Sequence, residues 1–285
     1  MASLKLIECP RDAMQGIGNF IPTEKKIRYI QQLLKVGFDT IDMGSFVSSR
    51  AIPQMKDTQK VIEGLDLSAT SSKLLTIIAN ARGAEMAAEF DEVHYLGFPF
   101  SISEEFQKRN TNATIDESMK RVEAIENICE KQGKELVIYI SMAFGNPYGE
   151  DWTVDIAAHW VEVMASRGIG IISMSDTIGT STADSISYLM GHLIPAFPQV
   201  EFGAHLHTRP EKWKEKVESA YRNGCRRFDG AIRGFGGCPM ASDNLVGNMA
   251  TENLLQFMAE EGIESGLDME AFRISEELSL NTFPT

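Results

Sequence analysis

The amino-acid sequence predicts an α/β protein, a (β/α)8 TIM barrel in which residues 1–285 form a single domain with a C-terminal helical extension. Strand-like runs alternate with helical runs almost to the end of the chain. This alternation implies a parallel sheet, because parallel neighbours need crossover helices. A chain of 285 residues is long enough for eight such units, and barrels of this size are commonly one domain. A six-stranded doubly wound sheet, the alternative, would carry the fingerprint G-x-G-x-x-G after its first strand, where the sequence reads CPRD at residues 9–12.

Eight strand-like runs account for the predicted barrel wall. They are expected at residues 4–9, 38–42, 74–79, 93–97, 135–142, 169–175, 200–207 and 228–232. Helical runs with one apolar face fill the intervals. One begins at the capping-box pattern of Thr114 and Glu117 and stops near Gly133. The others begin at about Thr23 or span about residues 53–63, 81–89, 153–165, 183–193, 210–223 and 251–261.

Composition excludes several classes of protein. The formal net charge of −13 argues against a nucleic-acid-binding surface, which normally carries a basic patch. No window approaches the roughly 18 apolar residues of a membrane helix, and the N-terminus lacks a signal-peptide pattern. The four cysteines are scattered without C-x-x-C spacing, which favours reduced thiols. We therefore expect a soluble cytoplasmic protein.

Two histidines end the seventh predicted strand. Because side chains alternate along a strand, His205 and His207 should project to the same side. Two neutral imidazoles held side by side can chelate a divalent cation. A hydrogen-bonded strand end without metal explains the pair equally well when it is considered alone. Its position in a barrel favours the metal, because active sites of barrels lie at the carboxyl ends of the strands.

Polar side chains also follow the other strands, and a barrel would bring them to one mouth. The candidates are Arg11, Asp12, Asp42, Tyr139, Ser141, Ser173, Asp176, His205, His207, the loop at residues 233–238, and Asn248. One aspartate, two histidines and one asparagine give oxygen and nitrogen ligands suited to Mg²⁺ or Mn²⁺. The absence of thiolate pairs argues against structural zinc.

Each candidate also has a structural interpretation. Arg11 and Asp12 could form a surface ion pair, which contributes little to stability. Asp42, Asp176 and Asn248 could be helix N-caps. Cys238 could be a small buried hydrophobe, and its Gly-Gly context modestly favours a functional loop. Tyr139 and Ser173 are as compatible with the barrel interior as with substrate binding.

Several longer motifs resemble the 3-hydroxy-3-methylglutaryl-CoA lyase family, within the metal-dependent barrel lyases and acyl-CoA condensing enzymes. The matching segments are PRDAMQ (10–15), SFVSSR (45–50), PQM (53–55), SDTIG (175–179), HLH (205–207), GGCP (236–239) and GNMATE (247–252). They occur in the family's order and span nearly the whole chain. The resemblance implies retro-Claisen cleavage of an acyl-CoA, with the acyl-CoA as the small-molecule partner and a homodimer as a possible assembly.

The resemblance also implies roles for individual residues. The divalent cation would be bound by Asp12, His205, His207 and Asn248. Arg11 would stabilise the enolate oxygen of the departing acetyl-CoA, and Cys238 would protonate its carbanion. Asp42 occupies the place of a glutamate usually found near that arginine, so the catalytic set is Arg11, Asp12, Asp42 and Cys238. The expected substrate-binding residues are Gln15, Ser45, Tyr139, Ser173 and Asp176.

Three segments depart from the family pattern. The first motif has Cys9 and Ala13 where glycines are common. Thr208-Arg209-Pro210 replaces the usual Asp-Thr after the second histidine, and the segment from Cys238 to Asn248 is one residue longer. These changes spare the metal ligands but alter loops near the substrate. They keep open an aldolase or a condensing enzyme acting on a different oxoacid. A non-catalytic barrel that binds a carboxylate or CoA is the alternative of another class.

Overall fold

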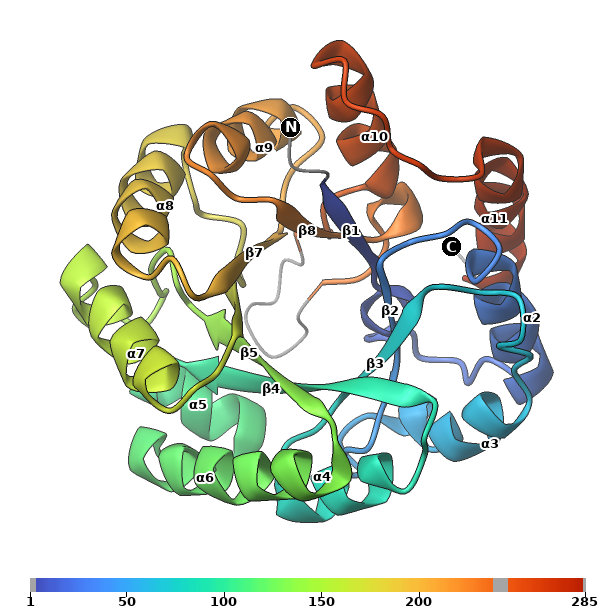
Figure 1. Cartoon of the computed structure of the whole chain (residues 1–285), viewed down its shortest axis with the longest axis horizontal. Helices are drawn as coiled ribbons and strands as arrows, with labels where there is room; N and C mark the ends of the chain where they lie inside the picture. Colours follow the sequence, from blue (N-terminus) through green and yellow to red (C-terminus); the bar gives the residue numbers. More distant parts are fainter. Residues whose placement is uncertain (1–3, 238–245, 284–285) are drawn as a thin grey trace.

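The fold is the predicted (β/α)8 barrel. The computed structural model describes residues 4–237 and 246–283. Eight parallel strands pair in sequence order and close through β1 and β8 (Figure 1). The strands are β1 (Lys5–Glu8), β2 (Thr40–Ser45), β3 (Lys73–Ile77), β4 (Val93–Ser101), β5 (Glu135–Ser141), β6 (Ile171–Asp176), β7 (Glu201–Leu206) and β8 (Arg227–Gly230). Each predicted strand overlaps one of these.

Helices surround the barrel (Figure 1). Those that follow the strands are α2 (Thr23–Leu33), α3 (Thr58–Glu63), α4 (Ala81–Ala88), α6 (Ile115–Gln132), α7 (Val154–Ser166), α8 (Ala183–Ala196), α9 (Trp213–Arg222) and α10 (Thr251–Glu260). The helix predicted at 53–63 is divided into a 3-10 turn, η1 (Pro53–Met55), and α3. A second 3-10 turn, η2 (Ile232–Gly234), follows β8. Within the described ranges, no helix is both long and apolar enough to span a membrane.

Two short helices were missed by the sequence reasoning. The helix α1 (Pro10–Met14) has only five residues, too few to show an apolar period. The helix α5 (Glu104–Thr111) buries only Phe106 and Gln107 and so has no apolar stripe. Its start is fixed locally, because the Oγ of Ser103 accepts a hydrogen bond from the backbone N–H of Phe106 at 3.1 Å.

The predicted capping box of α6 is confirmed. The backbone N–H of Glu117 donates to Thr114 Oγ1 at 3.1 Å, and the backbone N–H of Thr114 donates to Glu117 Oε2 at 2.9 Å. The helix ends at Gly133, whose φ of +65° is left-handed.

The barrel interior contains an apolar cluster separate from the core between strands and helices. Its members are Leu75, Ile77, Tyr95, Val137, Tyr139 and Ile171, all on β3–β6. Their neighbours along the same strands, such as Leu74, Leu96 and Ile138, belong to the outer core, as the strand period of two requires. This cluster closes the barrel beneath the site.

The last helix, α11 (Met269–Thr282), lies beside α2 (Figure 1). The side-chain amide of Gln32 donates to the carbonyl of Ala271 at 3.0 Å, and the backbone N–H of Asp268 donates to the carbonyl of Val36 at 2.9 Å. The rings of Tyr29 and Phe283 meet edge to face at 5.1 Å. These contacts dock the C-terminal helix onto the first large helix.

Glu8 joins β1 to the connection between β8 and α10. It is 1% exposed. Its Oε1 accepts the backbone N–H of Ile232 at 2.9 Å, and its Oε2 lies 2.6 Å from Thr251 Oγ1. Burial raises the pKa of Glu8 to about 8, although both hydrogen bonds act in the opposite direction.

We predict that replacing Glu8 by Gln changes the pH dependence of stability. Above pH 4.5 the unfolded chain ionises at Glu8 while the folded protein keeps the proton. The wild-type unfolding free energy should therefore fall by about 1.4 kcal/mol per pH unit from this group until the pH passes about 8. Gln cannot ionise. In urea denaturation, the unfolding free energy of the Glu8→Gln variant should therefore rise relative to that of wild type between pH 5 and 8. A difference that does not change with pH would contradict this.

Gly83 brings α4 close to the segment after β2. A Cβ added at Gly83 would lie 2.5 Å from the backbone oxygen of Phe46, a contact that a rigid backbone cannot relieve cheaply. The residues next to Phe46, Ser45 and Val47, line the cavity described below. The close approach therefore helps to fix one wall of the site.

Gly83→Ala should destabilise the protein by about 1–3 kcal/mol through overpacking. Helix propensity alone predicts the opposite, a gain of about 1 kcal/mol. Gly191→Ala in α8 is the matched control, because its Cβ would meet only the side-chain end of Asn223. Urea midpoints that shift equally for both variants would contradict the close-packing argument.

Candidate active site

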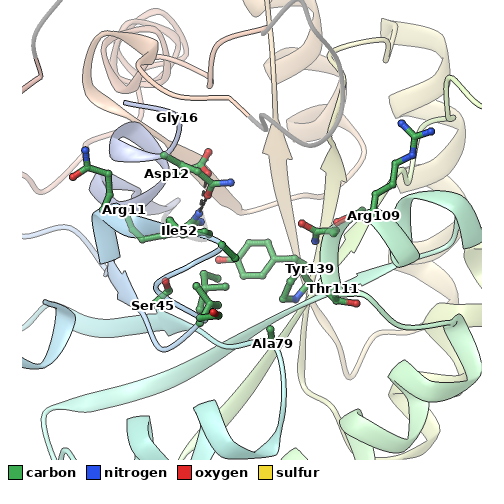
Figure 2. Close-up of a pocket in the computed structure, with 18 of the residues that line it drawn as sticks. Arg11, Asp12, Gly16, Ser45, Ile52, Ala79, Arg109, Thr111 and Tyr139 are labelled. Atoms are coloured by element: carbon green, nitrogen blue, oxygen red, sulfur yellow. Dashed lines mark hydrogen bonds and ion pairs between the residues drawn. The ribbon is translucent and has the colours of Figure 1, made fainter. Parts of the chain in front are cut away.

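A cavity of about 870 Å³ opens at the carboxyl ends of the strands (Figure 2). Eight of the residues predicted from sequence line it: Arg11, Asp12, Gln15, Ser45, Tyr139, Ser141, His205 and His207. In the view of Figure 2, Arg11, Asp12 and Ser45 lie on one side of Tyr139, and Thr111 and Arg109 lie on the other. The cavity thus joins β1, β2, β5 and β7, which are distant in sequence.

The four predicted metal ligands come together, and three of them, Asp12, His205 and His207, line this cavity. Ligand atoms of Asp12, His205 and His207 all lie within 4.8 Å of one another. The Nε2 atoms of the two histidines face each other at 3.3 Å, which agrees with their expected projection to one side. His207 lies just beyond β7 and forms an isolated bridge with Asn248.

Asn248 faces Asp12 and does not act as an N-cap. The N-cap position of α10 is occupied by Ala250. The Nδ2 of Asn248 donates to Asp12 Oδ2 at 2.7 Å and to the carbonyl of Phe235 at 2.8 Å. Both amide protons are used in this way, so Oδ1 is the atom available to a cation.

The charges in this group suit a bound cation. Burial opposes ionisation of Asp12, but Arg11 and the two histidines lower its pKa to about 2. Burial and the neighbouring His205 lower the pKa of His207 to about 4, which leaves a neutral imidazole near pH 7. Burial opposes the charged form of His205, but its hydrogen bond to Asp229 raises its pKa above the ordinary value, so a cation would displace a proton there. One carboxylate and two imidazole nitrogens are ligands for a divalent cation. The described residues therefore fit the metal that the resemblance implies.

Arg11 is a buried cation, not the partner in a surface ion pair. Its Nη1 donates to Asp12 Oδ1 at 2.9 Å and to Gln15 Oε1 at 2.6 Å. Its Nη2 and Nε donate to Asp42 Oδ2 at 2.7 and 3.0 Å. Burial opposes the charge, but the carboxylates of Asp42 and Asp12 raise the pKa of Arg11 above its ordinary value. Asp42 thus holds Arg11 and caps no helix.

Hydroxyl groups line the cavity beside the cation site. Within the described part of the chain, Tyr139 Oη, Ser45 Oγ and Ser175 Oγ are buried without a hydrogen-bond partner. The ring of Tyr139 meets that of His205 edge to face at 5.8 Å. Tyr139 and Ser45 are therefore placed to meet a ligand in the cavity.

Two predicted substrate-binding residues lie outside the cavity wall. Ser173 is fully buried beside Tyr139 in the β5–β6 register. Asp176 pairs with Lys216 Nζ at 2.7 Å and accepts the backbone N–H of Ser181 at 3.1 Å. Lys216 in turn donates to the carbonyl of His207 at 2.9 Å. Asp176 is thus linked to the metal ligand His207 through Lys216, and its binding of substrate stays a prediction.

Cys238 lies outside the described residues, and its role also stays a prediction.

The sequence reasoning missed several residues at the site. Lys216 reads as an ordinary helix lysine, although its neighbour Val217 marks the buried face of α9. Asp229 on β8 accepts a hydrogen bond from His205 Nδ1 at 2.9 Å. A polar rim from α5 to α6 also lines the cavity: Arg109, Asn110, Thr111, Asn112 and Arg121. Because α5 was not predicted from the sequence, these residues could not be assigned to the site.

Removing the buried guanidinium of Arg11 should destabilise the protein. Arg11→Met leaves Asp12 and Asp42 without their partner, and breaking such a pair costs about 3–5 kcal/mol. The double variant Arg11→Met, Asp42→Asn removes one stranded charge and should recover part of this loss. Urea denaturation in the presence of a chelator measures both. A single variant as stable as wild type would show that the ion pairs contribute no net stability.

Comparison with known proteins gives a consistent result. The family model described as HMGL-like matches residues 5–278. The mitochondrial hydroxymethylglutaryl-CoA lyase of Gallus gallus is 32% identical over 269 residues, which cover 94% of this chain and 89% of the relative. The hydroxymethylglutaryl-CoA lyase of Bacillus subtilis (strain 168) is 30% identical over 261 residues, 92% of this chain and 86% of the relative. An HMG-CoA lyase from Acinetobacter baumannii, solved with coenzyme A and 3-methylmalate, superposes with a TM-score of 0.91 at 29% identity, covering 99% of this chain and 91% of that one. The family resemblance is confirmed: this chain belongs to the HMGL-like family.

Proposed function

We propose that the protein is a divalent-metal-dependent carbon–carbon lyase that cleaves 3-hydroxy-3-methylglutaryl-CoA to acetyl-CoA and acetoacetate. One observation carries the proposal. The buried guanidinium of Arg11 donates a hydrogen bond to Asp12, and Asp12 also forms, with His205 and His207, a group that could hold a metal ion at the same cavity. The relatives named as hydroxymethylglutaryl-CoA lyases support the same reaction.

Retro-Claisen cleavage requires charge stabilisation at a defined oxygen. A base takes the proton of the tertiary hydroxyl. The alkoxide oxygen then forms the ketone of acetoacetate as the neighbouring C–C bond breaks, and the bonding electrons move into the thioester to give an enolate. The enolate carbon then takes up a proton to become the methyl group of acetyl-CoA. An electrostatic partner at the enolate oxygen lowers the barrier, because it acts where negative charge develops.

Arg11 retains one donor for that oxygen. A guanidinium has five N–H groups. Within the described residues, four of them serve Asp12, Gln15 and Asp42, which leaves one N–H on Nη2. The same bonds fix the orientation of Arg11, so the free donor is held in place before substrate arrives.

Asp12, His205, His207 and Asn248 would hold the cation, which we propose to be Mg²⁺ or Mn²⁺. When bound, such a cation orients the substrate hydroxyl and makes it more acidic. Tyr139 and Ser45 would contact the acyl group. We propose that Cys238 donates the final proton. A cytoplasmic location and a homodimer stay predictions from the sequence.

The decisive assay offers 3-hydroxy-3-methylglutaryl-CoA to the purified protein with Mg²⁺ or Mn²⁺. We expect acetoacetate and acetyl-CoA in equal amounts, and loss of turnover on adding chelator. The double variant Arg11→Met, Asp42→Asn should lose at least about 100-fold in kcat, with circular dichroism confirming its fold. No cleavage with either metal would contradict the proposal.

The same assay separates the alternatives. Thr208-Arg209-Pro210 follows the second histidine, with Thr208 buried, and alters the chain next to the site. Condensation of acetyl-CoA with another oxoacid, without cleavage of 3-hydroxy-3-methylglutaryl-CoA, would favour a condensing enzyme. Tight calorimetric binding of acyl-CoA without any turnover would favour a non-catalytic barrel.

A further inference from the structure

His205 belongs to two clusters of metal-ligating side chains. Its ligand atoms lie within 4.8 Å of those of Asp12 and His207, and also of those of Cys9 and Asp229. The two clusters use different sides of one ring, because Nε2 faces His207 Nε2 at 3.3 Å whereas Nδ1 lies 2.9 Å from Asp229 Oδ2. The structure therefore offers two places for a cation.

Only the first cluster, Asp12 with His205 and His207, is placed to hold a cation that touches a ligand in the cavity. Asp12, His205 and His207 line the cavity, whereas Cys9 and Asp229 do not. Cys9 is 1% exposed and Asp229 is 3% exposed. A cation between these two residues would lie beneath the cavity and could not touch a substrate. The second cluster therefore needs another explanation.

We propose that Asp229 is a positioning residue for His205. By accepting the Nδ1–H, Asp229 fixes the tautomer and the ring plane of His205, so that the lone pair of Nε2 points at the cation held with Asp12 and His207. Carboxylates that orient metal-bound imidazoles in this way commonly change metal affinity 10- to 100-fold. The inference rests on the proposed metal site, but it concerns binding of the metal and not the reaction.

A buried arginine beneath Asp229 suits this role. Arg227 lies two residues earlier on β8, so both side chains project into the barrel. Arg227 is 1% exposed, and its Nη1 reaches Glu201 at 3.2 Å. Its Nε and Nη2, like Asp229 Oδ1, have no hydrogen-bond partner among the described residues. The guanidinium of Arg227 and the side chain of Asp229 thus share the inward face of β8, where their opposite charges attract.

A glycine on β7 lies between that arginine and Ser173. Gly203 pairs with Arg227 in the β7–β8 register. A Cβ at this glycine would lie 3.4 Å from Arg227 Cδ and 2.9 Å from Ser173 Oγ. The strand that carries His205 thus packs closely against Ser173 two residues before it, with the side chain of Arg227 in ordinary van der Waals range.

Calorimetric titration of metal-free protein with Mn²⁺ tests the proposal without any substrate. Asp229→Asn keeps an acceptor oxygen but loses the charge, and should weaken the Kd by about 10-fold; Asp229→Ala removes both and should approach 100-fold. Asp57→Asn is the matched control, because Asp57 is a buried carboxylate that pairs with Lys26 at 2.6 Å outside this site. Cys9→Ser is the second control. Both controls should bind Mn²⁺ as wild type does.

Three results would overturn the proposal: Asp229 variants that bind Mn²⁺ as tightly as wild type, a loss in Cys9→Ser as large as in Asp229→Ala, or wild-type protein that does not bind Mn²⁺. If the Asp229 variants do not fold, the position of the ring proton of His205 in the wild-type protein tests the proposal instead. Long-range ¹H–¹⁵N spectra of the Mg²⁺-bound protein should place the His205 proton on Nδ1, and a proton on Nε2 would contradict the assignment. Wild type that binds Mn²⁺ but cleaves no acyl-CoA would end the proposed function while leaving this inference intact.

Discussion

The whole site depends on one buried positive charge, the guanidinium of Arg11. Arg11 lies between the carboxylates of Asp12 and Asp42 inside the barrel mouth. Buried carboxylates that face each other without a cation would repel and would take up protons. With Arg11 in place the pKa of Asp12 falls to about 2, whereas burial still raises the pKa of Asp42 to about 6. Asp12 can therefore serve both the guanidinium and a metal. All five residues of α1 are buried, so the first turn after β1 forms part of the site.

The barrel interior is divided between apolar and polar halves. The apolar cluster belongs to β3–β6. Arg227, Asp229, His205 and Asp42 come from β8, β7 and β2, with Arg11 and Asp12 following β1. Because these strands are neighbours in the closed barrel, the charged groups can compensate one another while Tyr139 forms the boundary with the apolar half. This division concentrates ion pairs and metal ligands on one side of the mouth.

Much of the fold could be predicted because periodicity and capping are local signals. The capping box at Thr114 is an example. The helix α5 could not be predicted, since its stability comes from Ser103 and from contacts made after folding. His205 and His207 were ambiguous alone and gained meaning only from partners distant in sequence. Asp229 carried no signal, because an aspartate within a short strand looks the same whether it supports a metal ligand or faces solvent.

The central claim is that the C–C bond breaks toward a thioester enolate at Arg11. Turnover of 3-hydroxy-3-methylglutaryl-CoA in D₂O tests it most directly, with the acetyl-CoA examined by mass spectrometry. An enolate that is protonated on the enzyme by a solvent-exchangeable group predicts one deuterium in the acetyl methyl group of each product molecule. Acetyl-CoA that forms without deuterium would contradict the account.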